Sequence, residues 1–250
     1  MTTILITNDD GIHSPGLKAL QEALQPLGNT FVIAPERDNS AVSHSLTMHR
    51  PLKVHQLEPQ SYTVDGTPTD CVAIGLKKIL SKQPDLLVSG INAGANLGDD
   101  ISYSGTVSAA IEATMYGIPS IAISVGGKLP LQYGGAMKIA ACMAEKVLGN
   151  QLPEQTLLNI NVPSGENYNK IKITRQGRRL WKDAIQETID PWGNKRYWIG
   201  GGTALADPQQ DTDVHVFASG NVSITPIQLD LTNHAGITFI QNTWRLENKD

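Results

Sequence analysis

Composition and charge describe a globular protein rather than a disordered chain, with 23 glycines, 14 prolines and 40% hydrophobic residues among 250. The formal net charge is −4 and no basic stripe is visible, which argues against a nucleic acid polymer as the main partner. A small anionic substrate is compatible with this charge, because a metal ion or a helix N-terminus supplies local positive charge.

Short β-branched runs alternate with helical patterns through residues 1–150. Ile4–Thr7 predicts a first strand, and Ser14 followed by Pro15 predicts a helix to about Leu27. We expect further strands at Thr30–Ala34, Asp85–Ser89 and Ser120–Ser124, a hairpin of Leu52–His55 with Tyr62–Val64, and helices over Thr67–Leu80, Val107–Tyr116 and Gly134–Leu148. This alternation indicates an α/β fold with a largely parallel sheet that is covered by helices on both faces.

The second half of the chain has a different character. LLNINVP, KIKIT and NVSITPI predict strands, and the aromatic-rich section from Arg175 to Gly202 predicts a projecting β-arm. Exposed aromatic residues on an arm favour a homo-oligomer contact over packing against the chain's own core. We predict a single domain over 1–250, with an α/β core at 1–150, the β-arm at about 175–202, and C-terminal strands and an extension at 203–250.

The cysteines and the first residues of the chain indicate the cellular compartment of the protein. Cys71 and Cys142 fall in apolar helical patterns without metal-ligand spacing, so we expect two reduced core thiols. The chain begins directly with an apolar strand, and no stretch of roughly 18 apolar residues occurs. We therefore expect a cytoplasmic protein with no membrane partner.

Polar clusters follow three of the expected strands, and ligands of parallel α/β sheets bind at the carboxyl ends of strands. Asp9 and Asp10 follow the first strand; in isolation, turn chemistry is the simpler interpretation of Asp-Asp-Gly. Adjacent carboxylates at a buried strand end repel each other, however, and a bound cation relieves this. Oxygen donors without paired histidines or cysteines favour Mg²⁺, Mn²⁺ or Ca²⁺ over zinc.

The loop after the second strand offers further donors. Ser40 can give its hydroxyl or carbonyl oxygen to the metal, although a polar surface loop is the alternative. His44 is a candidate proton donor or substrate contact, but a lone loop histidine is more often neither.

A glycine-rich loop from Gly90 to Gly105 is the most informative stretch. Asn92 and Asn96 offer neutral oxygen donors, and Ser104, Gly105 and Thr106 lie at the start of a helix. Free N–H groups and hydroxyls at a helix N-terminus form a phosphate cradle, whereas simple N-capping would need only one hydroxyl. The chain contains no G-x-x-x-x-G-K-[ST], G-x-G-x-x-G, G-x-S-x-G or H-E-x-x-H pattern, so the usual nucleotide and hydrolase fingerprints are not the source of this inference.

Several motifs taken together resemble one family. In order, they are NDDG, APERDNSAVSHSLT, SGINAGAN, YSGTVSAA, LLNINVP and SGNVSITPI. The sequence resembles the SurE family, the survival proteins E that act as metal-dependent nucleoside 5′-monophosphate phosphatases. The resemblance covers nearly the whole chain and implies a Rossmann-like core with a β-hairpin arm, swapped C-terminal elements and assembly as a homodimer or homotetramer.

The resemblance also implies roles for individual residues. It assigns one divalent cation per subunit, with Mg²⁺ and Mn²⁺ as the first candidates, to Asp9, Asp10, Ser40 and Asn92. It places Asn96 and Ser104, Gly105 and Thr106 around the phosphate of a nucleoside monophosphate, with Asp9, Asp10 and Asn96 in the catalytic set. Short polyphosphate is a plausible second substrate on the same ground.

The expected mechanism is metal-assisted hydrolysis of a 5′-phosphate. Asp9 or Asp10 takes a proton from water or attacks directly; the sequence leaves both open. A non-catalytic nucleotide or sugar-phosphate sensor and a phosphoryl or nucleotidyl transferase are the rival hypotheses, and a purely structural oligomer is the weakest.

Overall fold

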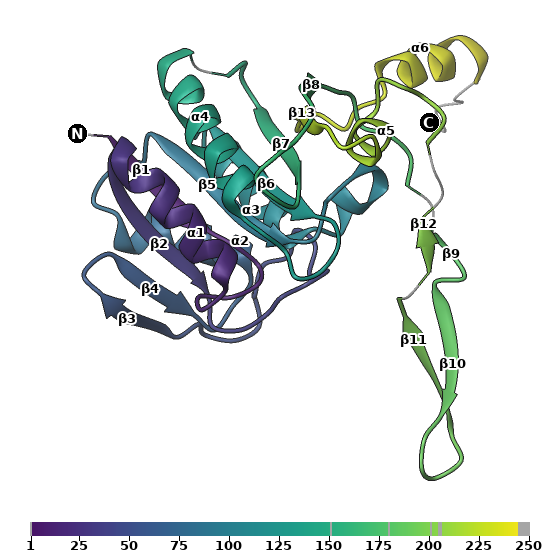
Figure 1. Cartoon of the computed structure of the whole chain (residues 1–250), viewed down its shortest axis with the longest axis horizontal. Coiled ribbons are helices and arrows are strands. Elements are labelled where there is room, and N and C mark those ends of the chain that lie inside the picture. Colours follow the sequence, from purple (N-terminus) through teal and green to yellow (C-terminus); the bar gives the residue numbers. More distant parts are fainter. Residues whose placement is uncertain (1, 151, 180, 201, 205–206, 245–250) are drawn as a thin grey trace, which may run out of the picture.

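The computed structural model describes residues 2–150, 152–179, 181–200, 202–204 and 207–244, and within them a nine-stranded sheet forms the centre of the molecule (Figure 1). In spatial order its strands are β3 (Val54–Glu58), β4 (Ser61–Val64), β2 (Asn29–Pro35), β1 (Thr3–Thr7), β5 (Leu86–Ala93), β6 (Ser120–Gly126), β7 (Thr156–Pro163), β13 (Val222–Gln228) and β8 (Ile171–Ile173). The β3–β4 and β13–β7 pairs are antiparallel, and every other neighbouring pair is parallel.

Two layers of helices cover this sheet. Helices α1 (Pro15–Leu24) and α4 (Gly134–Asn150) pack on one face, and α2 (Pro68–Ile74) and α3 (Gly105–Met115) pack on the other. Side chains alternate across a strand, so β1 gives Ile4 to the first layer and Leu5 to the second. Burial on both faces explains why the parallel strands are short, continuous apolar runs.

Local sequence signals account for the starts of the helices. The Ser14 hydroxyl accepts a hydrogen bond from Leu17 N at 3.3 Å, and α1 begins with a proline. Thr67 and Asp70 form a reciprocal capping box at the start of α2. Both helical segments end within a residue of the expected positions, but their last turns are not α-helical: α1 passes into a 3-10 turn at Gln25–Leu27, and α2 continues as a π-helical segment, Gly75–Ile79.

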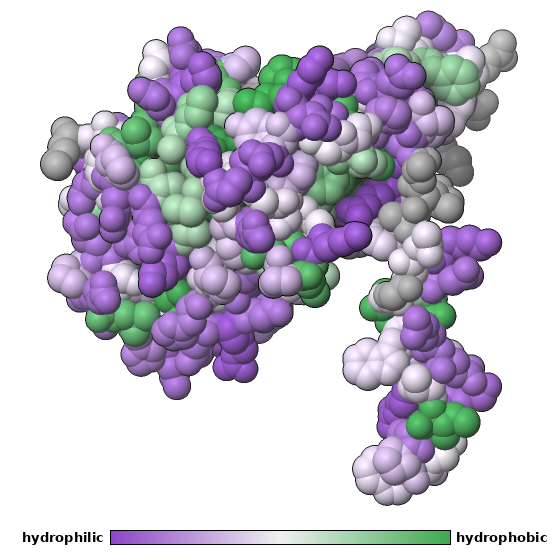
Figure 2. Space-filling view, viewed as in Figure 1, coloured by the Kyte–Doolittle hydropathy of each residue, from purple (hydrophilic) through white to green (hydrophobic). Residues whose placement is uncertain are grey.

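The arm consists of β9 (Trp181–Lys182), β10 (Ile185–Ile189), β11 (Lys195–Ile199) and β12 (Thr203–Ala204). Its strands pair only with one another among the described residues, β10 with β11 and β9 with β12. Figures 1 and 2 show it as a narrow projection from the body, with apolar and hydrophilic residues interspersed on its surface.

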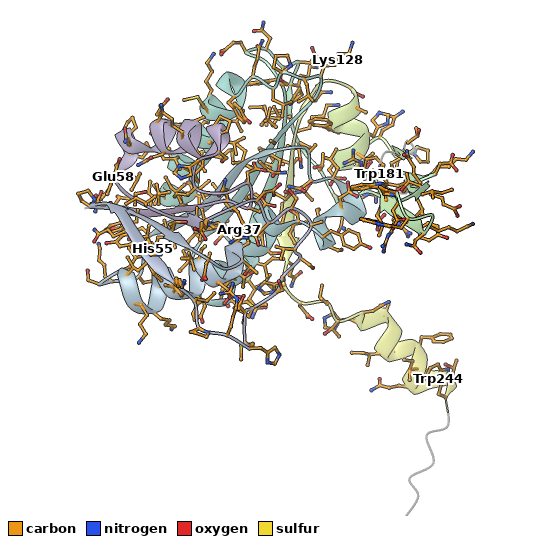
Figure 3. All side chains as sticks on the ribbon, turned by 90° about the horizontal axis from the view of Figure 1, so that it is seen from below. Arg37, His55, Glu58, Lys128, Trp181 and Trp244 are labelled. Atoms are coloured by element: carbon orange, nitrogen blue, oxygen red, sulfur yellow. The ribbon has the colours of Figure 1, made fainter. Side chains whose placement is uncertain are left out.

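The C-terminal section contains two helices that the sequence analysis did not predict, α5 (Asp213–Ala218) and α6 (His234–Thr243). No residue of α6 is buried, and Trp244, at its end, lies well away from the sheet (Figure 3). A helix without a buried face has no tertiary packing to mark it in the sequence. The predicted α/β class, three-layer core and projecting arm are confirmed, whereas the division into parts within one domain stays a prediction.

One expectation about the cysteines is wrong. Both are free and Cys71 is buried, but Cys142 is exposed because it lies on the outer side of α4. Burial raises the pKa of the Cys71 thiol well above its usual range. Among the helices of the described residues, none combines the length and hydropathy needed to cross a bilayer.

Candidate metal and phosphate site

The carboxyl ends of β1, β2 and β5 meet at one edge of the sheet, because these strands are parallel neighbours. The loop after β2 reaches the turn after β1, where Asn39 N donates to the carbonyl of Asp9 at 2.8 Å. From the end of β5, Ala93 N donates to the Asp10 carboxylate at 3.1 Å. The structure thus brings the three polar strand ends together.

The turn after β1 is fixed by its own side chains. Asn8 Nδ2 donates to the carbonyl of Gly11 at 3.0 Å and to the Ser14 hydroxyl at 2.7 Å, which ties the turn to the cap of α1. Gly11 has a φ of +97° and faces the backbone of Arg37 so closely that a Cβ would lie 3.2 Å from it. Only glycine combines that φ with that approach, so the turn holds both aspartates in a defined position.

Asp9 lies against the N-terminus of α3. The Thr106 hydroxyl donates a very short hydrogen bond to Asp9 Oδ1, and a Cβ on Gly105 would lie only 2.8 Å from Asp9 Cβ. The missing Cβ therefore allows the helix end to approach the carboxylate. The first N–H groups of α3 have no intrahelical partners, and they favour negative charge here.

Both aspartates have raised pKa values. Burial raises the pKa of Asp9 to about 6, although the Thr106 hydrogen bond lowers it, and the charge of Asp10 raises it further. Burial also raises the pKa of Asp10, against the Ala93 hydrogen bond that lowers it, with the charge of Asp38 as a further raising cause. The charge of Asp10 acts on Asp9 and that of Asp38 acts on Asp10, and the resulting negative potential is one that a divalent cation would neutralise.

Ser40 lies on the loop after β2, and Asn92 is the second-to-last residue of β5. The Ser40 hydroxyl, which is exposed, donates to Asp38 Oδ1 at 2.6 Å. Asn92 donates its Nδ2 to the carbonyl of Gly94 at 2.7 Å, so its side-chain oxygen is the atom that a cation could use.

The donor chemistry fits a hard divalent cation. Carboxylate, amide and hydroxyl oxygens are the ligands that Mg²⁺ and Mn²⁺ prefer. In the described part of the chain no three His, Cys, Asp or Glu side chains gather as a metal-binding group, because only part of this donor set is of those types. The buried side-chain oxygens of Thr7 and Asn8, at and just after the end of β1, have no hydrogen-bond partner. Such orphaned acceptors suit a bound cation with its water shell.

The residues predicted to surround a phosphate lie on both sides of a short 3-10 helix, η3 (Gly98–Ser102). After it, the Ser104 hydroxyl accepts from Val107 N at 3.1 Å and so caps α3. Before it, the Asn96 side chain donates to the Ser124 hydroxyl at 2.9 Å, and the Asn96 carbonyl accepts from Asn159 and Asn161. The N-capping alternative for Ser104 is therefore real, but it does not explain the close approach at Gly105.

His44 points to another part of α3. Its Nε2 lies 2.8 Å from the buried Glu112 carboxylate, two turns along the helix from Gly105. The structure therefore gives His44 a partner that the sequence analysis did not anticipate. A cavity of about 410 Å³ opens on another side of the site, beside Asp10, with Glu36, His13 and Tyr133 in its wall.

Residues 4–183 match the family model described as Survival protein SurE. The chain belongs to the SurE family. It is 50% identical over 232 residues to the 5′-nucleotidase SurE of Syntrophotalea carbinolica, with 92% of each chain covered. It is also 50% identical to the 5′-nucleotidase SurE of Pelobacter propionicus, covering 96% of this chain and 98% of that one. The crystal structure of the SurE protein from Aquifex aeolicus superimposes with a TM-score of 0.86 at 45% identity, covering 96% and 98% of the two chains.

The sequence analysis did not identify the residues that hydrogen-bond to Asn96 from the neighbouring strand β7. Asn159 and Asn161, both within β7 and fully buried, donate hydrogen bonds to the carbonyl of Asn96. Asparagines at alternate positions of a buried strand are unusual, because each needs hydrogen-bond partners. That oddity in LLNINVP was the available signal.

Proposed function

We propose that this chain hydrolyses nucleoside 5′-monophosphates to nucleosides and phosphate with one divalent cation per chain. Membership of the SurE family and the printed names of its relatives support the reaction. The observation that carries the site is the pair of adjacent carboxylates, Asp9 and Asp10, whose pKa values are raised and of which Asp9 faces the start of α3.

Asp9, Asp10, Ser40 and Asn92 would hold the cation, and Mg²⁺ or Mn²⁺ suits their oxygen donors. When bound, the cation supplies positive charge for phosphoryl oxygens and makes coordinated water more acidic. Thr106 fixes the direction of the Asp9 carboxylate through its hydroxyl.

Asn96, Ser104, Gly105 and Thr106 would surround the substrate phosphate. Backbone N–H groups at the start of α3 offset the charge that develops on the phosphoryl oxygens. Since the helix end and the asparagine network are fixed before substrate binds, little reorganisation is needed during the reaction.

The assembly and location belong to the same proposal. Exposed apolar residues of the arm, such as Trp192 at 83% exposed, support a homodimer or homotetramer. Two free cysteines fit a reducing compartment such as the cytoplasm. Short polyphosphate is proposed as a second substrate class, since the cradle requires only a terminal phosphoryl group.

A phosphate-release assay tests the function. The purified chain is given a panel of nucleoside 5′-monophosphates, 3′-monophosphates and short polyphosphates after EDTA treatment, with Mg²⁺ or Mn²⁺ added back separately. We expect release from the 5′-monophosphates only when metal is restored. Binding of nucleotide without release would identify a sensor, and release only with a second acceptor would identify a transferase.

A further inference from the structure

The helix η3 connects the two halves of the phosphate cradle. Asn96 precedes it and Ser104 follows it, so the position of η3 sets where Ser104 lies relative to Asn96. Its two carboxylates, Asp99 and Asp100, do not face the candidate metal site. They contact the base of the arm instead, which we call the arm root and define as Gln176, Gly177, Arg178, Arg179 and Trp181.

Asp100 makes the central contacts. One carboxylate oxygen accepts from Arg179 Nη1 at 2.8 Å, and the other accepts from Trp181 Nε1 at 2.8 Å. The Arg179 guanidinium carbon lies 4.7 Å from the centre of the Trp181 ring, so the three side chains contact one another pairwise. Arg179 Nη1 also donates to the carbonyl of Ala95, next to Asn96, at 3.2 Å.

Further hydrogen bonds, each between a side chain and a backbone group, join η3 and the arm root. Arg179 N donates to Asp99 Oδ2 at 2.8 Å, and Gln176 Nε2 donates to the carbonyl of Gly98 at 2.9 Å. Buried Asp213 on α5 accepts from Gly98 N at 2.9 Å and from Gly177 N at 2.8 Å. The contact is therefore continuous along η3 and does not rest on one side chain.

The Asp100–Arg179 ion pair is more buried than the ion pair on the hairpin of the arm. The side chains of Arg179 and Asp100 are 17% and 21% exposed, whereas Lys195 and Glu187 on the hairpin are 65% and 45% exposed. An exposed pair contributes little in water, while a charge-assisted pair shielded from solvent is stronger and costly to leave half-made. The Asp100 contacts therefore hold η3 more firmly than the hairpin pair holds the arm.

The other side of the loop is already fixed, because Asn96 is held by Ser124, Asn159 and Asn161. We propose that Asp100, Arg179 and Trp181 form a clasp through which the arm root positions η3 and with it the phosphate cradle. Asp100 is then a positioning residue of the reaction, and the arm acts on the site of its own chain as well as on partners. This inference rests on the proposed function for its activity readout.

Two variants test the clasp. Asp100→Asn removes the charge that Arg179 needs, and Trp181→Phe removes the indole N–H while keeping an aromatic ring beside Arg179. Glu187→Gln is the matched control, because it removes a carboxylate from an exposed ion pair of the same arm. Each variant is assayed for kcat and KM with a nucleoside 5′-monophosphate, for inorganic phosphate affinity by calorimetry, and for mass and melting temperature.

We expect kcat/KM to fall roughly 10-fold or more in Asp100→Asn and less in Trp181→Phe, since small misplacements of binding groups are costly. The dissociation constant for inorganic phosphate should rise in both, at unchanged mass, while Glu187→Gln stays at the wild-type values. Asp100→Glu should restore part of the loss. Arg179→Gln added to Asp100→Asn should lower kcat/KM little further, because the two residues act as one unit.

Phosphate affinity and kcat/KM within twofold of wild type in both variants would overturn the clasp. Losses that only follow a reduced mass or a smaller folded fraction would overturn it too, since they would reflect assembly or stability. An inactive wild-type protein would count against the proposed function alone, because the phosphate affinities of the variants still test the clasp.

Discussion

Most folded proteins bury apolar residues and expose polar ones. The site at the carboxyl ends of β1 and β5 and the projecting arm depart from this pattern in opposite directions. The edge buries polar groups such as Asp9, which is 4% exposed, while the arm exposes apolar ones such as Trp198, which is 68% exposed. Each arrangement is unfavourable for an isolated chain. Under the proposed function, a group outside the chain compensates each of them: a cation and a phosphate at the carboxyl ends of the strands, and a partner subunit on the arm.

The largest expected effect comes from removing one charge at the edge. Asp9→Asn and Asp10→Asn should each lower kcat by roughly 100-fold or more, because the cation that would offset the developing phosphoryl charge loses an anionic ligand. Circular dichroism should show an unchanged fold, and Glu58→Gln, on the exposed strand β3, is the control. Activity within a few-fold of wild type would remove the metal assignment.

Closing the approach at the start of α3 should have the next largest effect. Gly105→Ala places a Cβ 2.8 Å from Asp9 Cβ, so the carboxylate or the helix must shift. We expect kcat/KM to fall by up to about 100-fold, as for other small misplacements at reacting groups. Gly149→Ala, also in a helix, is the control because its Cβ would meet open space.

A full-activity Gly105→Ala variant would show that the helix end need not approach the aspartate so closely. Steady-state kinetics at saturating metal make that comparison, and a melting curve for each alanine variant shows whether the fold tolerates the added methyl group.

The pH dependence of stability in the metal-free protein is the third test. Folded Asp9 holds its proton to about pH 6, whereas the ordinary pKa of the group is 3.8. The folded state therefore binds more protons in this window, so its free energy of unfolding falls as pH rises from about 4 to about 6, by about 3 kcal/mol at most. Asp9→Asn should remove this fall and be more stable than wild type at pH 7.5 in EDTA.

Urea unfolding at pH 5 and pH 7.5 measures the difference. Adding Mg²⁺ or Mn²⁺ at pH 7.5 should stabilise the wild type and leave Asp9→Asn nearly unchanged. If the free energy of unfolding changed equally with pH in both proteins, Asp9 would not be the group whose raised pKa causes the change.

The smallest effect on catalysis should come from the β10–β11 hairpin of the arm. Replacing Trp192 and Trp198 together by serine removes exposed apolar surface, so light scattering should report a smaller assembly. The kcat/KM per chain should stay within roughly a factor of two, because distant sites without shared partners behave independently. A large loss would mean that the candidate site needs the assembly, and the contrast between edge and arm would fail.

Much of the core was predictable because its signals are local. Alternating β-branched runs and helical patterns marked the parallel strands, and Ser14 with Pro15 marked the start of α1. Helix α6 was not predictable from packing because it buries no residue, and the exposure of Cys142 depends on which side of α4 faces the sheet. The orientation of His44 toward Glu112 depends on a contact between residues 68 positions apart.

The sequence by itself determined the class of the fold, the family, and the residue types of the candidate site, since these depend on periodicity and on short motifs such as Asn8-Asp9-Asp10-Gly11. Only the tertiary structure decided how those residues are held. The raised pKa of Asp9, the contact of Thr106 with it, and the connection from Asp100 to Arg179 arise between distant segments. Burial and electrostatics depend on what surrounds a group in space, and the chain order does not contain that information directly.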